Sequence, residues 1–170
     1  MERFDVTKQL LIMRHAKADR DEMRWQDFDR PLNERGLLDA PTMGRWLQQQ
    51  QFKFDQIIAS PAVRTKDTAR LVAEQLKYLN PIQTPQSLYE GSSREYMAQI
   101  GLCPASVVSI LIVGHNPALE QVVERLTGQW ITLKTSAVAY LRYSGSDWSK
   151  IKSETLELVE TWSPKTISRL

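Results

Sequence analysis

The feature that most constrains the fold is the run VVSILIV at residues 107–113, which would be apolar on both faces of a strand. Such a strand must be covered on both sides, as in parallel sheets that carry helices on each face. Two shorter apolar runs, at residues 10–13 and 56–59, precede it. Strand-like runs that alternate with helix-like stretches predict an α/β fold with a mostly parallel sheet.

Helices are expected between and after these runs. They are predicted over residues 34–50, after Ser60-Pro61, over residues 94–100, and from Asn116-Pro117 to Gly128. Pro41 should bend or break the first helix, because proline lacks an amide proton and clashes with the preceding turn. Ser60 is the expected N-cap of the second helix, with Pro61 at its first position. Ser92 and Glu95 fit a capping box for the third.

The last third of the chain carries a different pattern. Runs at residues 137–143 and 156–161 flank the turn SGSDWS and predict an antiparallel hairpin. A further short strand is possible at residues 82–84, within a connection that contains proline. No repeat, low-complexity tract or internal boundary interrupts the 170 residues, so one domain is expected over residues 1–170.

Charge and cysteine content narrow the function. The net charge of +2 argues against a nucleic-acid or membrane surface. No run approaches the ~18 apolar residues of a membrane span. Cys103 is the lone cysteine, so neither an internal disulfide nor a cysteine-based metal site is expected. The charged N-terminus, MERFDVTKQ, lacks the apolar segment of a signal peptide. The simplest expectation is a cytoplasmic protein.

Charged and imidazole side chains follow three of the predicted strands. Arg14 and His15 follow the first, Arg64 lies in the first turn of the helix after the second, and His115 follows the third. Ligand sites of open α/β sheets gather beyond the carboxyl ends of strands. We therefore expect these four side chains to meet at one edge of the sheet.

This set of side chains suits a phosphoryl group. Two guanidinium groups can bind phosphate oxygens bidentately, and helix N-termini add amide donors. One histidine can attack phosphorus, while the other donates hydrogen bonds as charge shifts. Each residue alone has a common structural explanation, such as a surface ion pair for Arg14 or a helix cap for His115. A metal site is disfavoured because HxH and HExxH spacings are missing, and a serine triad because no GxSxG motif occurs.

Four ordered motifs carry a family resemblance. LIMRHAKAD is similar to the Arg-His-Gly signature of the histidine phosphatase (phosphoglycerate-mutase-like) superfamily. DFDRPLNERG, IIASPAVRTKDTA and LIVGHNP resemble its later blocks in the same order. The first two forms are most similar to the short branch of SixA-type phosphohistidine phosphatases. The resemblance spans roughly residues 10–137 and implies a three-layer α/β/α sandwich.

The resemblance also implies roles for particular residues. His15 would be the nucleophile, Arg14 and Arg64 would hold the phosphate, and His115 would stabilise the transferring group. Asn116 follows the second histidine as it often does in the family. We expect it chiefly as an N-cap of the next helix, close to the bound phosphate. No metal or organic cofactor would be needed.

Three positions depart from the family pattern. Ala16 replaces the usual glycine, so its backbone should avoid a positive φ. The asparagine that often follows the nucleophile is missing, and Lys17 could replace it as a phosphate ligand. Glu90 lies near where other branches place a general acid, and it fits equally well as an ordinary loop carboxylate before a helix.

The expected reaction is hydrolysis of a phosphoryl group through a phosphohistidine at His15, with inorganic phosphate as product. Imidazole can leave from phosphohistidine already protonated on its remote nitrogen, so a weak or absent acid favours that substrate. Short connections predict an open pocket, which suits a phosphorylated protein and a role in signal transduction. The alternatives are a small phosphate ester or anhydride as substrate, or a non-catalytic phosphate-binding regulatory module. The loop at residues 19–30, with Trp25 and Phe28, is expected at the rim.

Overall fold

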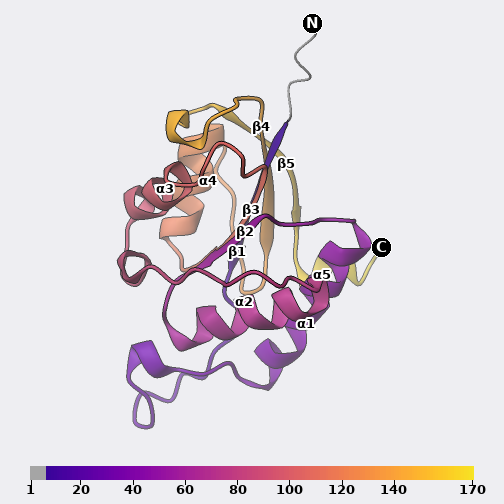
Figure 1. Ribbon diagram of the computed structural model, residues 1–170. Helices are drawn as coiled ribbons and strands as arrows, with labels where there is room; N and C mark the ends of the chain where they lie inside the picture. Colours follow the sequence, from indigo (N-terminus) through magenta and orange to yellow (C-terminus); the bar gives the residue numbers. More distant parts are fainter. Residues whose placement is uncertain (1–6) are drawn as a thin grey trace, which may run out of the picture.

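A computed structural model describes residues 7–170 of the chain (Figure 1). The expectation that the chain lacks a signal peptide rests on the charged N-terminus, of which residues 1–6 lie outside this range. The five strands of the sheet are β1 (Lys8–Arg14), β2 (Gln56–Ala59), β3 (Ser109–Gly114), β4 (Val138–Tyr143) and β5 (Leu156–Trp162). Their order across the sheet is β2-β3-β1-β4-β5, which places β1 in the centre.

The sheet is mostly parallel, as predicted. β1 and β2 both pair with β3 in parallel. β4 runs antiparallel to β1, and β5 runs antiparallel to β4, so β4 alone opposes the direction of the others. The expected late hairpin is therefore confirmed as β4 and β5.

Helices cover both faces of the sheet. They are α1 (Glu34–Gln49), α2 (Val63–Leu76), α3 (Ser93–Gly101), α4 (Ala118–Thr127) and the short α5 (Pro164–Ile167). Three single turns of 3-10 helix complete the structure, η1 (Asp27–Asp29), η2 (Gln86–Leu88) and η3 (Trp148–Lys150). Figure 1 shows α1 and α2 on one side of the sheet and α3 and α4 on the other. This arrangement is the predicted three-layer α/β/α sandwich.

The central strand β1 contributes to both hydrophobic cores. Leu10 and Ile12 pack with α3 and α4, whereas Leu11 and Met13 pack with α1 and α2. All four side chains are completely buried. Burying one such side chain contributes about 1.5–3 kcal/mol, so β1 is firmly held where its carboxyl end enters the functional site.

Two helix starts and one helix interior differ from the predictions. Pro41 lies inside α1, which continues through it because proline removes a single hydrogen bond while Met43 and Leu47 stay packed on the sheet. α2 begins at Val63 with Ala62 as its N-cap, so the assignment of Ser60 as the cap was wrong. α4 begins at Ala118 with Pro117 as its N-cap, so the assignment of Asn116 as the cap was also wrong.

Other local predictions hold. The capping box of Ser92 and Glu95 starts α3, and Gly128 ends α4 in the left-handed conformation. The strand expected at residues 82–84 is a single bridge, in which Gln83 exchanges backbone hydrogen bonds with Ile57 and Ala59 at the edge of β2. Within residues 7–170, no helix is both long enough and apolar enough to cross a bilayer.

Candidate active site

The carboxyl ends of β1, β2 and β3 lie level with one another. Arg14 is paired with Gly114, and Ala59 with Val113. The next residues continue the ladder, because the amide of His15 donates to the Gly114 carbonyl at 3.0 Å and the amide of Ser60 donates to Val113 at 3.0 Å. Parallel register thus delivers His15, Ser60 and His115 to one edge of the sheet.

A cavity of about 490 Å³ opens at this edge. Its lining includes six of the predicted site residues, Arg14, His15, Arg64, Glu90, His115 and Asn116. It also includes Asp27, Arg30, Tyr89, Ser92 and Gln121. The predicted phosphate ligand Lys17 is not among the lining residues. The structure therefore brings together every predicted site residue except Lys17.

His15 is held in one orientation and one tautomer. Its ring nitrogen Nδ1 lies 2.7 Å from the carbonyl oxygen of Ala16, so Nδ1 carries the proton and donates it. Burial lowers the pKa of His15 to about 3, despite the opposing effect of this hydrogen bond, so the ring is neutral near pH 7. The lone pair is therefore on Nε2, which is the atom a nucleophilic histidine needs.

Ala16 fits beside the nucleophile without strain. It is not among the described residues with a positive φ, as its methyl group requires. Its amide donates to the hydroxyl of Thr68 at 2.9 Å, which joins the chain after β1 to α2. The glycine usual at this position is therefore dispensable here.

His115 lies beside His15, with 5.4 Å between ring centroids. Its Nδ1 is 3.3 Å from a guanidinium nitrogen of Arg64, and its Nε2 is 2.7 Å from the hydroxyl of Ser60. Burial, reinforced by the charge of Arg64, lowers the pKa of His115 to about 4. The neutral ring accepts from Arg64 and donates to Ser60. A hydroxyl both donates and accepts, so Ser60 can also support the reverse tautomer, which frees an Nδ1 proton for a phosphoryl oxygen.

The backbone of His115 is fixed by a close contact. Its amide donates to the hydroxyl of Tyr96 at 3.2 Å, and that hydroxyl donates to the Leu88 carbonyl at 3.3 Å. Burial raises the pKa of Tyr96 to about 12, so the hydroxyl keeps its proton. A Cβ on Gly114 would lie 2.3 Å from this hydroxyl oxygen, so glycine is required at that position.

Arg64 comes from the first turn of α2 and is almost fully buried. Its two terminal nitrogens donate to Asp27, at 2.7 Å to the backbone carbonyl and 3.2 Å to the carboxylate. The same carboxylate accepts from the Tyr89 hydroxyl at 2.9 Å and lies 3.2 Å from Arg30. Burial alone would raise the pKa of Asp27, but the Tyr89 hydrogen bond and the Arg64 charge lower it. Asp27 is therefore ionised at neutral pH.

Arg14 is oriented by the loop before β4. It donates to the Leu133 carbonyl at 3.1 Å, and the side-chain amide of Asn116 donates to the same carbonyl at 2.8 Å. Asn116 also donates to Glu120 at 2.9 Å, while its Oδ1, the atom that a helix cap would use, has no hydrogen-bond partner within residues 7–170. The buried Nε of Arg14 has no hydrogen-bond partner within residues 7–170, so it can still donate to a ligand.

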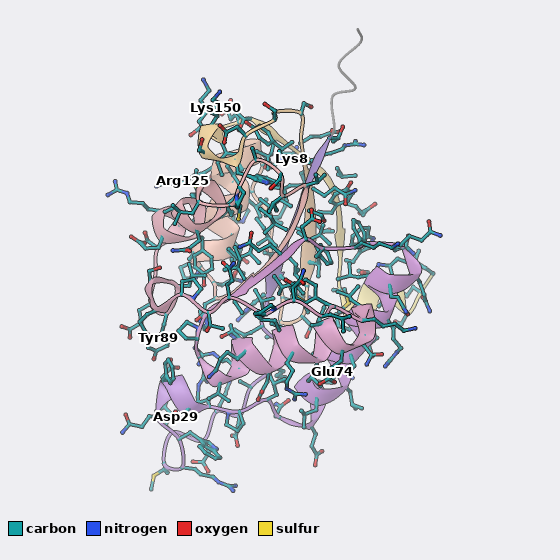
Figure 2. The ribbon with its side chains drawn as sticks, in the orientation of Figure 1. Lys8, Asp29, Glu74, Tyr89, Arg125 and Lys150 are labelled. Atoms are coloured by element: carbon teal, nitrogen blue, oxygen red, sulfur yellow. The ribbon has the colours of Figure 1, made fainter. Side chains whose placement is uncertain are left out.

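The remaining candidates lie at the rim. Glu90 is exposed, has a left-handed backbone (φ 57°), and lines the cavity. Its neighbour Tyr89 packs edge-to-face on Phe28, with 4.8 Å between ring centroids, which joins the loop before α3 to η1. Figure 2 labels Tyr89 beside the turn that carries Asp29. Trp25 donates to Asp19 at 3.3 Å within its own loop, so both rim aromatic residues anchor the loop.

Sequence reasoning missed four residues of the cavity region. Ser60 follows β2 directly, and the strand-end argument that found the histidines could have found it too. Asp27, Arg30 and Tyr89 come from irregular segments whose conformation no periodicity predicts.

Within residues 7–170, no three histidine, cysteine or acidic side chains cluster as metal ligands would. The assembled groups are a neutral nucleophilic imidazole, a second imidazole and three guanidinium groups, a set suited to a tetrahedral anion.

The comparisons with known proteins agree with this chemistry. The sequence model of the histidine phosphatase superfamily (branch 1) matches residues 10–100. The phosphohistidine phosphatase SixA of Escherichia coli strain K12 is 27% identical over 122 residues, which cover 69% of this chain and 73% of that protein. An uncharacterised protein of a Picosynechococcus species is 32% identical over 165 residues, covering 92% and 97% of the two chains.

The solved structures extend the likeness to the fold. The protein histidine phosphatase SixA complexed with tungstate superposes with a TM-score of 0.82 at 26% identity, covering 94% of this chain and 99% of that one. This match confirms the SixA-like arrangement of sheet and helices. The family model matches more than half of the sequence, and the chain belongs to the histidine phosphatase superfamily.

Proposed function

We propose that this phosphatase works through a covalent phosphohistidine on His15 and that its substrate is protein phosphohistidine. The observation that carries the proposal is the hydrogen bond from His15 Nδ1 to the Ala16 carbonyl, 2.7 Å long. It leaves Nε2 unprotonated in a ring whose pKa is lowered to about 3 by burial. Nε2 would attack phosphorus as the bond from phosphorus to the leaving group breaks.

The surrounding groups support transfer of a phosphoryl group. Arg14 and Arg64 have guanidinium groups at the cavity wall, and His115 stands beside the nucleophile. Charge on the phosphoryl oxygens grows or shifts in the transition state, and preorganised donors in a partly dry cavity stabilise it. The SixA relative was solved in complex with tungstate, a tetrahedral oxyanion, which supports binding of such a group by a protein of this fold.

The second half of the reaction follows from the same tautomer. Water would attack phosphorus, the bond from phosphorus to Nε2 would break, and the water proton would leave with inorganic phosphate. His15 keeps its Nδ1 proton throughout, so it departs as a neutral imidazole and needs no acid. A phosphohistidine substrate is favoured because its own imidazole can leave in the first step as His15 leaves in the second, as a neutral ring without an acid.

The carboxylates of the cavity support that preference. Asp27 is a poor proton donor at neutral pH because its pKa is lowered by Tyr89 and Arg64. Glu90 is the other carboxylate of the lining, and it lies exposed at the rim. An alkoxide leaving group needs a proton, so a cavity without a buried acid suits a P–N bond better than a P–O ester. Lys17 lies outside this cavity, so we do not assign it to the scissile phosphate.

A small phosphate ester or anhydride is the second candidate substrate. A cavity of about 490 Å³ is large enough for a small metabolite, and Glu90 at its rim could protonate an alkoxide.

If the substrate is a phosphoprotein, we propose that the enzyme acts in signal transduction in the cytoplasm. We also propose that turnover needs neither a metal nor an organic cofactor.

The test compares a phosphohistidine protein with p-nitrophenyl phosphate, and His15→Ala with the unmodified enzyme. His15→Ala should lose several orders of magnitude in kcat on both substrates, and rapid quenching should reveal a phosphoryl group on the unmodified protein alone. Chelators should leave the rate unchanged. Persistent turnover by His15→Ala would overturn the nucleophile assignment. Binding of phosphate without any turnover by the unmodified protein would instead support the non-catalytic module.

Glu90→Gln separates the two substrate classes. A large loss on the ester with little loss on phosphohistidine is expected if imidazole leaves without acid catalysis. Equal losses on both substrates would contradict the leaving-group argument. A phosphohistidine protein that is hydrolysed more slowly than the ester would favour the small-molecule candidate.

A further inference from the structure

A second cavity, of about 330 Å³, opens beside the active-site cavity. The two cavities share Arg14, His15 and Arg30 in their walls. The rest of the second cavity is lined by Lys17, Ala18, Arg20, Glu22 and Thr135. Four of its eight lining residues are therefore cations, and one is a carboxylate. This composition differs from that of the first cavity, where three cations face two carboxylates.

The loop at residues 19–30 has mixed charge in sequence, but the fold separates its charges. Asp19 accepts the amide of Asp21 at 3.0 Å and the indole of Trp25 at 3.3 Å. Asp21 accepts the amides of Met23 at 3.1 Å and Arg24 at 3.2 Å. These two carboxylates are engaged within the loop.

Asp27, a later carboxylate of the loop, lines the first cavity and not the second. It binds Arg64 and also pairs with Arg30, at 3.2 Å in each case. The loop therefore presents Arg20 and Arg30 to the second cavity, with Glu22 as the single opposing charge.

Three of the four cations of the second cavity are poorly neutralised, whereas Arg30 pairs with Asp27. Within residues 7–170, no carboxylate lies at ion-pair distance from Arg14, Lys17 or Arg20. The Nε of Arg14 is buried and has no hydrogen-bond partner among these residues. Burial lowers the pKa of Arg14, the Glu120 carboxylate partly opposes this effect, and the positive charge of Arg20 lowers the pKa further. The guanidinium groups of Arg14 and Arg20 therefore repel each other.

Like charges around one hollow raise the free energy of the unliganded protein, and a bound anion relieves that repulsion. The neutral ring of His15 adds no charge of its own. Because Arg14, His15 and Arg30 belong to both cavities, an anion in the second would lie next to a phosphoryl group in the first. One substrate molecule that carries two negative groups could therefore fill both.

We propose that the second cavity is a subsite for a second anionic group of the substrate, a carboxylate or a phosphoryl group, bound by Arg14, Lys17, Arg20 and Arg30. The proposal rests on the proposed function, since it assumes that the scissile phosphoryl group occupies the first cavity. On a phosphoprotein, the second anion is a glutamate or aspartate close to the phosphohistidine. On a small substrate, it is a second phosphate or a carboxylate. The subsite therefore selects substrates by charge as well as by the scissile bond.

The test uses phosphohistidine peptides that differ in one neighbouring residue, which is Glu, Gln or Lys. The unmodified enzyme should prefer the Glu peptide over the Gln peptide in kcat/KM by about tenfold, as charge-assisted hydrogen bonds suggest, mostly through KM. The Lys peptide should be the poorest of the three. Arg20→Gln should reduce the preference for Glu to about twofold or less.

Glu22→Gln is the matched control, because it removes the one negative charge of the same cavity. It should increase the preference for the Glu peptide, the opposite of the effect of Arg20→Gln. Both side chains are exposed on the loop, so neither substitution should unfold the protein. Opposite effects of two exposed neighbours cannot come from a general loss of structure.

A second arm distinguishes the sources of the anion. It compares phenyl phosphate with 3-carboxyphenyl phosphate. A preference for the carboxylated ester that Arg20→Gln removes, with no preference among peptides, assigns the subsite to a small substrate. Equal kcat/KM for all matched pairs, or preferences that Arg20→Gln leaves intact, would overturn the subsite while turnover itself upholds the phosphatase. An unmodified enzyme that hydrolyses neither peptide nor ester would instead overturn the proposed function.

Discussion

Asp27 binds the guanidinium group of Arg64 through both its backbone carbonyl and its carboxylate. The arginine expected to hold phosphate is thus already paired with an anion of the protein, which Tyr89 and Arg30 keep in place. A phosphate ion that enters the cavity must compete with this carboxylate. The pair gives the cavity a lower affinity for phosphate than its three arginines alone would.

Asp27→Asn should therefore strengthen inhibition by inorganic phosphate. The amide keeps the shape of the side chain and removes its charge, so the inhibition constant for phosphate should fall about two- to fivefold, as for other partly exposed pairs. Asp29→Asn, on the same turn (Figure 2), is the control, and it should leave the constant unchanged. Weaker inhibition in Asp27→Asn would mean that the carboxylate positions Arg64 more than it competes with phosphate.

The two histidines should be neutral over the physiological range. The pKa of His15 is lowered to about 3 and that of His115 to about 4, in both cases chiefly by burial. Since the chain has two histidines, a proton NMR titration shows both ring signals without further assignment. Neither should shift between about pH 5.5 and about pH 8, whereas a midpoint near the ordinary value of about 6.5 would contradict the burial argument.

The same pKa values predict how stability depends on pH. As pH falls below about 6.5, both histidines bind protons in the unfolded state. In the folded state His115 binds its proton only near pH 4 and His15 only near pH 3. The unfolded state binds more protons in this window, so the free energy of unfolding should decrease as pH is lowered through it. His15→Asn should reduce this dependence in urea titrations, and an unchanged slope would count against the buried neutral state.

Ser60 should support catalysis by orienting His115. Ser60→Ala leaves the His115 Nε2 without its hydroxyl partner at 2.7 Å, and kcat should fall about tenfold, the scale of one lost buried hydrogen bond. Ser109→Ala is the matched control, since Ser109 is also buried and its hydroxyl has no partner within residues 7–170. Equal kcat for the two variants would show that Ser60 is a packing residue only.

Gly114 should tolerate no side chain. In Gly114→Ala the new methyl group would meet the Tyr96 hydroxyl oxygen at 2.3 Å, so the free energy of unfolding should fall by about 1–3 kcal/mol. Gly101→Ala serves as the control, because the nearest atoms there are 3.8 Å away. Denaturation by urea measures both. Equal stability of the two variants would show that the Tyr96 ring moves aside without cost.

The sheet and the main site residues could be predicted because they obey short-range rules. Apolar runs that end abruptly in Arg14-His15 and before His115 indicate both the strands and the edge where they finish. Parallel register then brings those side chains together, whatever the loops do. Arg64 was found for the same reason, since it follows a strand by a few residues.

The rest depends on tertiary contacts that local rules do not contain. Ser60 fits the cap rule, but its hydroxyl is taken by His115, so α2 starts later. Asn116 fits the same rule, yet its Nδ2 donates to Leu133 and Glu120 and its Oδ1 accepts no amide of α4. Asp27 reaches Arg64 only because an irregular loop folds back across the cavity, and no residue pattern in that loop specifies the turn.

The acceptor that orients the nucleophile is a main-chain atom. When an aspartate or glutamate orients a histidine, one codon change can remove the partner that fixes the tautomer. The Ala16 carbonyl, in contrast, is present whatever residue occupies position 16. The chemical state of His15 is therefore protected against substitution of its partner. Variation near the nucleophile can thus alter the charges of Lys17 and Arg20 while the reactive nitrogen stays the same.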